Sequence, residues 1–112
     1  MFEIDSRNRV TLTRGDTAAF SCTIVNNDNE LRTPQEGDVL TLSIDGLEFE
    51  KRAVVDDGQF VFIITGSNTL DLNPGVYTYR VVLTNNSNQW TIIEECFFEL
   101  LGNGGEEDND EP

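Results

Sequence analysis

Paired carboxylates are the residues of this sequence that come nearest to a catalytic pattern. Glu48 and Glu50 are separated by one residue, and Glu94 and Glu95 are adjacent; two carboxylates that flank one bond can hydrolyse a glycoside. Side chains alternate along a strand, so the first pair is expected on one solvent-facing side and the second pair on opposite faces. The chain has no histidine, which excludes Ser-His and Cys-His pairs and imidazole metal ligands. We therefore expect no enzymatic activity and no cofactor.

Acidic residues on expected loops leave calcium binding open as an alternative, because calcium prefers several hard oxygen ligands. None of these residues belongs to an Asp-x-Asn-x-Asn-Gly loop, the pattern of a typical calcium site. Ordinary solvated turns are therefore their expected role. The loop acids considered are Asp28, Glu30, Asp56, Asp57 and Asp71.

The two cysteines are expected to be buried thiols. Cys22 follows Phe20 at the alternating spacing of a strand, and Cys96 precedes Phe98 in the same way, so both side chains share the apolar face that enters a core. An immunoglobulin disulfide packs on a tryptophan of the third strand, whereas Trp90 lies six residues before Cys96. The first residues also lack the pattern of a signal peptide. Free thiols are therefore favoured over a bridge.

Two further local patterns have both a functional and a structural interpretation. Arg14-Gly15-Asp16 is the tripeptide that integrins recognise, but glycine geometry and forward bonding by aspartate predict a structural turn between two strands. Tyr77, Tyr79 and Trp90 could form a sugar-stacking platform, although their alternation with aliphatic residues predicts core or sheet positions first. A carbohydrate- or cell-surface-binding module is therefore the alternative to a function in assembly.

The elements that must position these residues follow an apolar period of two. Alternation, which is typical of half-buried strands, runs through residues 10–13, 18–24, 40–44, 47–51, 60–64, 76–84 and 90–100. Turn residues at 45–46, 56–58 and 85–88 predict hairpins. Residues 60–64 are apolar on both faces, so we expect a central strand that is covered on both sides. The spacing predicts an all-β, immunoglobulin-like antiparallel β-sandwich of about seven strands.

Length and charge limit the possible partners. The 112 residues fit one domain, and 7 Lys+Arg against 21 Asp+Glu give a net charge of −14, which opposes binding to nucleic-acid phosphates. No stretch approaches the roughly 18 apolar residues of a membrane-spanning helix. We expect a β-sandwich domain over residues 1–101 and a flexible acidic tail over 102–112. The tail serves solubility or, as the alternative, attracts a basic surface on a partner.

The order of turn and strand segments across residues 8–100 resembles that of small β-sandwich proteins of tailed bacteriophages. The segments that carry the resemblance are Val10-Thr11-Leu12-Thr13-Arg14-Gly15-Asp16-Thr17-Ala18-Ala19-Phe20, Glu36-Gly37-Asp38 and Asn73-Pro74-Gly75-Val76-Tyr77-Thr78-Tyr79. They are similar to the N-terminal domain of the baseplate upper proteins of phages that infect Gram-positive bacteria. The resemblance implies a structural or accessory protein of the virion, assembled in the host cytoplasm, that docks on the baseplate, neck or capsid. It implies virion proteins or further copies of the chain as partners, rather than nucleic acid or membrane.

The segment before residue 10 is the candidate docking element. Phe2 and Ile4 alternate with polar residues, as in a strand that pairs with the edge of a partner sheet. The alternative is a short edge strand of the sandwich itself. Exposed apolar groups near strand edges would favour assembly, whereas aromatic faces on a concave surface would favour sugar binding.

Overall fold

The computed structural model describes residues 1–26 and 28–102. Most of the acidic tail expected over residues 102–112 therefore lies outside the described residues. In the described part, the elements are β1 (Phe2–Ile4), β2 (Val10–Thr13), β3 (Ala18–Cys22), β4 (Ile24–Val25), β5 (Leu31–Arg32), β6 (Asp38–Ile44), β7 (Phe49–Arg52), β8 (Val54–Asp56), β9 (Gln59–Ile64), α1 (Gly66–Thr69), β10 (Gly75–Asn85) and β11 (Asn88–Leu101).

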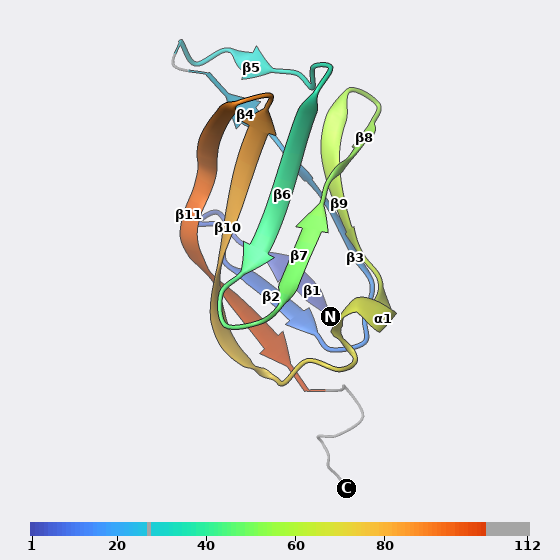
Figure 1. Cartoon of the computed structure of the whole chain (residues 1–112). Coiled ribbons are helices and arrows are strands. Elements are labelled where there is room, and N and C mark those ends of the chain that lie inside the picture. The colour runs from blue at the N-terminus through green and yellow to red at the C-terminus, as the bar shows by residue number, and fades with distance from the viewer. Residues whose placement is uncertain (27, 103–112) are drawn as a thin grey trace, which may run out of the picture.

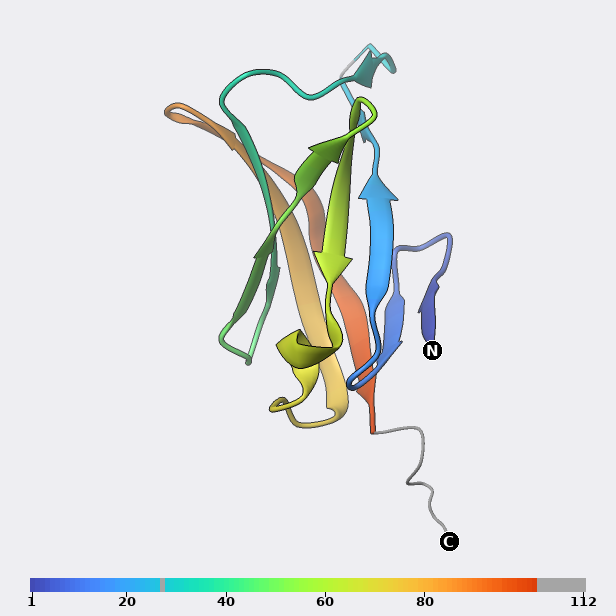
Figure 2. The ribbon, with the colours of Figure 1, turned by 90° about the vertical axis from the view of Figure 1, so that its right-hand side faces the viewer.

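Two sheets lie face to face around one core (Figure 1). The larger sheet has the order β1-β2-β11-β10-β6-β7 and the smaller sheet the order β3-β9-β8, while β4 and β5 form a separate hairpin. Figure 2 shows the sheets from the side. Paired strands are antiparallel except for β2 and β11, which are parallel. With β3 as strand B, the order matches the immunoglobulin arrangement of B, E and D against C, F and G. The predicted sandwich is confirmed.

Residues 1–26 and 28–102 form eleven strands rather than about seven, because several expected strands are interrupted. Residues 18–24 form β3, which pairs with β9, and β4, which pairs with β5. The chain passes through Ala53 from β7 in the larger sheet to β8 in the smaller sheet. Residues 2–4 add a further strand at the edge of the larger sheet.

Alternating side chains from both sheets fill the core. On β10, for example, Tyr79, Val81 and Leu83 are each 1% exposed. This is the period-two pattern of a half-buried strand. The fully enclosed side chains are Tyr79, Phe62, Phe98, Leu12, Leu40, Leu42, Ile64, Leu83, Leu100, Val10, Val81 and Thr69.

One prediction about β9 is wrong. Phe60, Phe62 and Ile64 face the core, and β9 is the middle strand of its sheet, as expected. Its other face is not covered, because Ile63 is 41% exposed and Val61 is half-buried. An antiparallel sheet can leave one face in water, and the outer face of β3-β9-β8 does so despite its apolar residues.

The expected hairpins form at the predicted turns. Asp57 and Gly58 both have positive φ angles, 52° and 75°, as a two-residue type I′ turn requires. This turn joins β8 to β9 through the pair Asp56 and Gln59. The longest hairpin joins β10 to β11 through the pair Asn85 and Asn88.

The Arg-Gly-Asp tripeptide forms a turn that joins distant parts of the fold. Gly15 has a φ of +90°, a conformation that favours glycine, and its N–H donates to the Thr69 hydroxyl at 2.9 Å. The Arg14 guanidinium donates to the Leu72 carbonyl at 3.2 Å. Asp16 pairs with the amino group at the start of the chain. These contacts place the tripeptide in a structural role against α1 and the segment that follows it.

A close approach between Gly66 and this turn generates a prediction. A methyl group at Gly66 would overlap the carbonyl oxygen of Gly15, so either the turn or α1 would have to shift. We expect Gly66→Ala to lower the free energy of unfolding, measured in urea, by about 1–3 kcal/mol. Ser67→Ala, at an exposed position of the same helix, should change it by less than about 0.5 kcal/mol. Equal stability of the two variants would contradict the packing argument.

Candidate functional site

The β4–β5 hairpin and the turn between β10 and β11 lie at the same end of the sandwich, at the top of Figure 1. In immunoglobulin variable domains, the loops between strands B and C and between F and G form part of the binding surface at one end. The β4–β5 hairpin lies between β3 and β6, in the place of the first of these loops, and the β10–β11 turn takes the place of the second. The topology therefore identifies this end as the candidate site.

Exposed apolar side chains gather at this end, which we call the tip site and define by Val25, Leu31, Arg32 and Trp90. Val25 is 52% exposed, Leu31 63% and Trp90 45%. Val25 and Leu31 are paired across the hairpin, so their positions are coupled. The tip site contains a hollow of about 380 Å³, lined by Ile24, Val25, Asn26, Arg32, Leu83, Trp90, Thr91 and Ile92.

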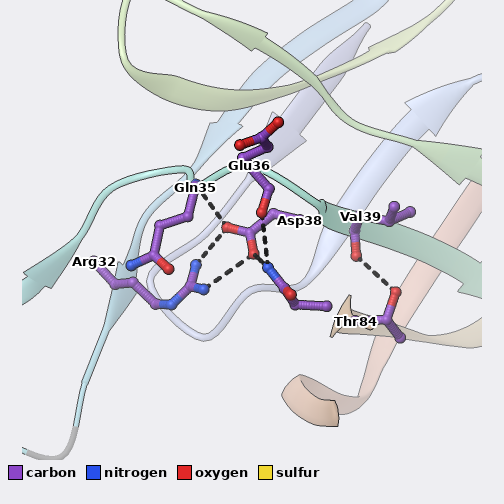
Figure 3. A network of polar contacts seen from close by, with 7 residues as sticks. Arg32, Gln35, Glu36, Asp38, Val39 and Thr84 are labelled. Carbon is purple, nitrogen blue, oxygen red and sulfur yellow. Dashed lines mark hydrogen bonds and ion pairs between the residues drawn. The ribbon is translucent and has the colours of Figure 1, made fainter. Parts of the chain in front are cut away.

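An ion pair holds the two hairpins in place. Two Arg32 nitrogens donate to the two Asp38 carboxylate oxygens at 2.6 and 3.0 Å. The Asp38 side chain is only 1% exposed, and it also accepts the Gln35 N–H and the Asn85 amide, each at 2.8 Å. Figure 3 shows the Arg32 and Gln35 contacts converging on this carboxylate. Asp38 therefore ties the β4–β5 hairpin to the end of β10.

The electrostatics of this network follow from its geometry. The Arg32 guanidinium and the other donors hold the pKa of the Asp38 carboxyl well below its usual range, although burial alone would raise it. Arg32 also lies over the Trp90 ring, 5.9 Å from its centroid, at the distance of a cation–π contact. Because the Arg32 charge is paired with Asp38, the contact of Arg32 with Trp90 serves to orient the indole ring. The tip site thus presents apolar surface on a rigid polar frame.

The structure places Phe2 and Ile4 on β1, which pairs with β2 at the edge of the larger sheet. The segment therefore forms an edge strand of the sandwich, and the docking role of Phe2 and Ile4 stays a prediction. The Phe2 ring stacks on Phe20 with centroids 5.3 Å apart, so it belongs to the margin of the core. Ile4 is 40% exposed. Neither residue lines the hollow of the tip site, which is formed mainly by β4, β5 and the start of β11.

The three aromatic residues considered for sugar stacking do not come together. Tyr79 is 1% exposed, its hydroxyl donates to the Asn8 carbonyl, and burial raises its pKa. The Tyr77 hydroxyl donates to the Asn73 carbonyl at 2.6 Å, as in the tyrosine corner of immunoglobulin-like domains. Only Trp90 faces the hollow of the tip site. A platform of three rings is therefore excluded by the positions of the two tyrosines.

Both cysteine thiols are free and pack against the core, but they are half-buried rather than buried. Each lies at the margin of the core, near the loop that joins β1 to β2. The Cys96 thiol lies 3.6 Å from the Arg7 carbonyl of that loop. Cys22 lines a hollow that also includes Asn8, and burial raises its pKa. A loop covers these positions less completely than a facing sheet would, which explains the residual exposure.

The acidic residues form no evident metal centre. Among the described residues, no three His, Cys, Asp or Glu side chains come close enough together to hold a metal ion.

Glu94 and Glu95 lie where the β10–β11 register shifts, and Glu95 has a positive φ of 50°. No helix in residues 1–26 and 28–102 is long and apolar enough to span a membrane.

The residues that frame the tip site were not recognisable from the sequence pattern. Arg32 and Asp38 are six positions apart, on either side of Pro34, and no periodicity connects them. The available signal was an opposite-charge pair flanking a proline-containing loop, which is a weak indication without the fold.

Comparison of the chain with protein-family models and with curated proteins gives no match.

The Arg32–Asp38 pair generates a prediction with a defined pH dependence. We expect Asp38→Asn to lower the free energy of unfolding at pH 7 by about 1–3 kcal/mol, because it weakens buried charge-assisted bonds and leaves Arg32 without its anion. The folded-state pKa of Asp38 is lowered, so its stabilisation is complete above the ordinary value near 4 and declines as the pH falls below it. The difference between wild type and variant, measured by urea unfolding, should shrink accordingly.

Asp71→Asn is the matched control, since it removes the same charge at an exposed position. We expect it to change stability by less than about 0.5 kcal/mol at pH 7. A difference for Asp38→Asn that stayed constant between pH 7 and pH 3 would contradict the role given to this carboxylate.

Proposed function

We propose that this chain is a non-enzymatic structural or accessory protein of a tailed-phage virion that docks on a repetitive surface of the particle. The resemblance of residues 8–100 to small virion proteins supports the proposal. Baseplate, neck and capsid are the surfaces that the resemblance implies. Under this proposal the chain assembles in the host cytoplasm and resides in the virion.

The observation that carries the proposal is the exposure of Val25, Leu31 and Trp90 on the strands of the tip site. Apolar groups are unfavourable in water, and their burial against a partner contributes a favourable free energy of about 25 cal/mol per Å² of apolar surface. A rigid frame reduces the entropy lost on docking. On a symmetric particle, many copies of one modest contact produce a stable assembly.

Charge favours proteins over other polymers as partners. The net charge of −14 repels phosphate groups of nucleic acids and anionic lipids. It also discourages free copies from associating before a complementary surface is present. Other virion proteins, and neighbouring copies held on the particle, are therefore the proposed partners.

A carbohydrate- or cell-surface-binding module is the alternative, and one observation favours it. Trp90 lines a hollow of about 380 Å³, within the size range of small-ligand pockets, and an exposed indole can stack on a sugar ring. The same residues of the tip site would serve either function. Quenching of the single tryptophan by an oligosaccharide, at saturable concentrations, would favour the alternative.

The docking proposal predicts a selective loss of particle binding. We expect the full chain to join one virion protein in a defined stoichiometry by light scattering, and Val25→Ser/Leu31→Ser to weaken that complex about tenfold or more. Val54→Ser/Val55→Ser is the matched control, because these residues are also about half exposed, at 49% and 59%, on the edge strand β8. If both double variants bound equally well, the tip site would not be the docking surface.

A further inference from the structure

A second apolar surface lies on the outer face of the larger sheet, away from the core. Val76 is 64% exposed and Phe97 is 55% exposed. They lie on the paired strands β10 and β11, where Val76 is opposite Glu99 and Phe97 is opposite Thr78. Two large apolar side chains therefore lie close together on a solvent-exposed sheet, an arrangement that often marks an interaction site.

Carboxylates border these residues in a row set by the strand register. Glu3 on β1 is opposite Thr11 on β2, Thr11 is opposite Glu99 on β11, and Glu99 is opposite Val76. We call Glu3, Val76, Phe97 and Glu99 the acidic strip. A hollow of about 380 Å³ runs along it and is also lined by Asp5 and Arg9.

Among the residues that the structure describes, none balances the charge of the acidic strip. Arg9 is the basic residue that lines the hollow, and its Nε lies 2.6 Å from the Asp5 carboxylate. Within residues 1–26 and 28–102, Glu3 and Glu99 form no ion pair. The local surface therefore carries a net negative charge beside exposed apolar groups.

We propose that the acidic strip binds a cationic, partly apolar segment of a partner protein, with lysine or arginine beside leucine-like side chains. Such a segment would place its basic groups on Glu3 and Glu99 and its apolar groups on Val76 and Phe97. Charge complementarity selects this chemistry, because the same carboxylates repel acidic segments and phosphates. One segment of this composition would cover the apolar groups of the strip and pair with its carboxylates at the same time.

This surface is distinct from the tip site. Trp90 and Phe97 on β11 are opposite Leu83 and Thr78 on β10, and five strand positions correspond to roughly 17 Å. Phe97 faces outward from the larger sheet, whereas Trp90 lines a hollow with Ile24 and Leu83 of the core. The inference therefore adds a second contact to the module and does not depend on the proposed role of the tip site.

A peptide titration of the full chain tests the inference. The probe is the acetylated and amidated peptide Lys-Leu-Lys-Leu-Lys, added to isotope-labelled protein and followed by the amide signals in NMR spectra. We expect saturable shifts at Val76, Phe97 and Glu99, about tenfold weaker binding for Phe97→Ser, and roughly three- to tenfold weaker binding for Glu3→Gln/Glu99→Gln. The corresponding Glu-Leu-Glu-Leu-Glu peptide should not bind.

Matched variants separate a specific site from the general attraction of an acidic protein. Glu36→Gln/Glu48→Gln removes two exposed charges elsewhere, and Val55→Ser removes an exposed apolar side chain from the other sheet; both should keep the wild-type affinity within about twofold. Leu31→Ser should also bind normally, since it alters only the tip site. Unchanged thermal melting would show that the Phe97→Ser protein is folded.

Three results would overturn the inference. The first is the absence of saturable shifts at the strip at millimolar peptide. The second is an equal loss of affinity in the two Glu→Gln double variants, which would indicate non-specific attraction. The third is wild-type affinity in folded Phe97→Ser.

Discussion

Burial of the inner face of each sheet against the other is the contact on which every other feature of the molecule depends. A chain with a net charge of −14 repels itself when it becomes compact. The core opposes this repulsion with aromatic and aliphatic side chains such as Phe62, Phe98 and Leu12, all at most 1% exposed. Two of its hydroxyl groups are bonded: that of Thr69 accepts the Gly15 N–H, and that of Tyr79 donates to the Asn8 carbonyl. Because the core excludes most charges, the surface carries the means of recognition.

Asp38 is an exception to the exclusion of charged groups from buried positions. Its side chain is nearly enclosed, and the desolvation of its charge is offset by Arg32 and by donors from Gln35 and Asn85. The arrangement joins segments far apart in the sequence at one end of the sandwich. Without it, the β4–β5 hairpin would lose its polar link to the end of β10. Under the proposed docking function, this structural ion pair would be required for recognition.

The two candidate interaction surfaces differ in chemistry. The tip site is apolar, and its one cation is paired internally, so shape and apolar burial would dominate its contacts. The acidic strip combines Phe97 with uncompensated carboxylates, which adds charge selectivity. The two surfaces lie at opposite ends of β11. A small module with two such contacts can link two neighbours, which suits a component of a repetitive assembly.

The fold class was predictable from the sequence, because side-chain alternation is a local property of strands. Turns such as Asp57-Gly58 likewise have local conformational requirements. The sequence also identified the structural nature of the Arg14-Gly15-Asp16 turn. It did not distinguish the exposed face of β9 from a covered one, since Ile63 looks the same in either environment. Three features became visible only in the folded chain. They are the Arg32–Asp38 pair, the separation of Trp90 from Tyr77 and Tyr79, and the row of residues from Glu3 to Val76. Each depends on which strands become neighbours, and pairing between distant segments produces no periodic pattern in the sequence.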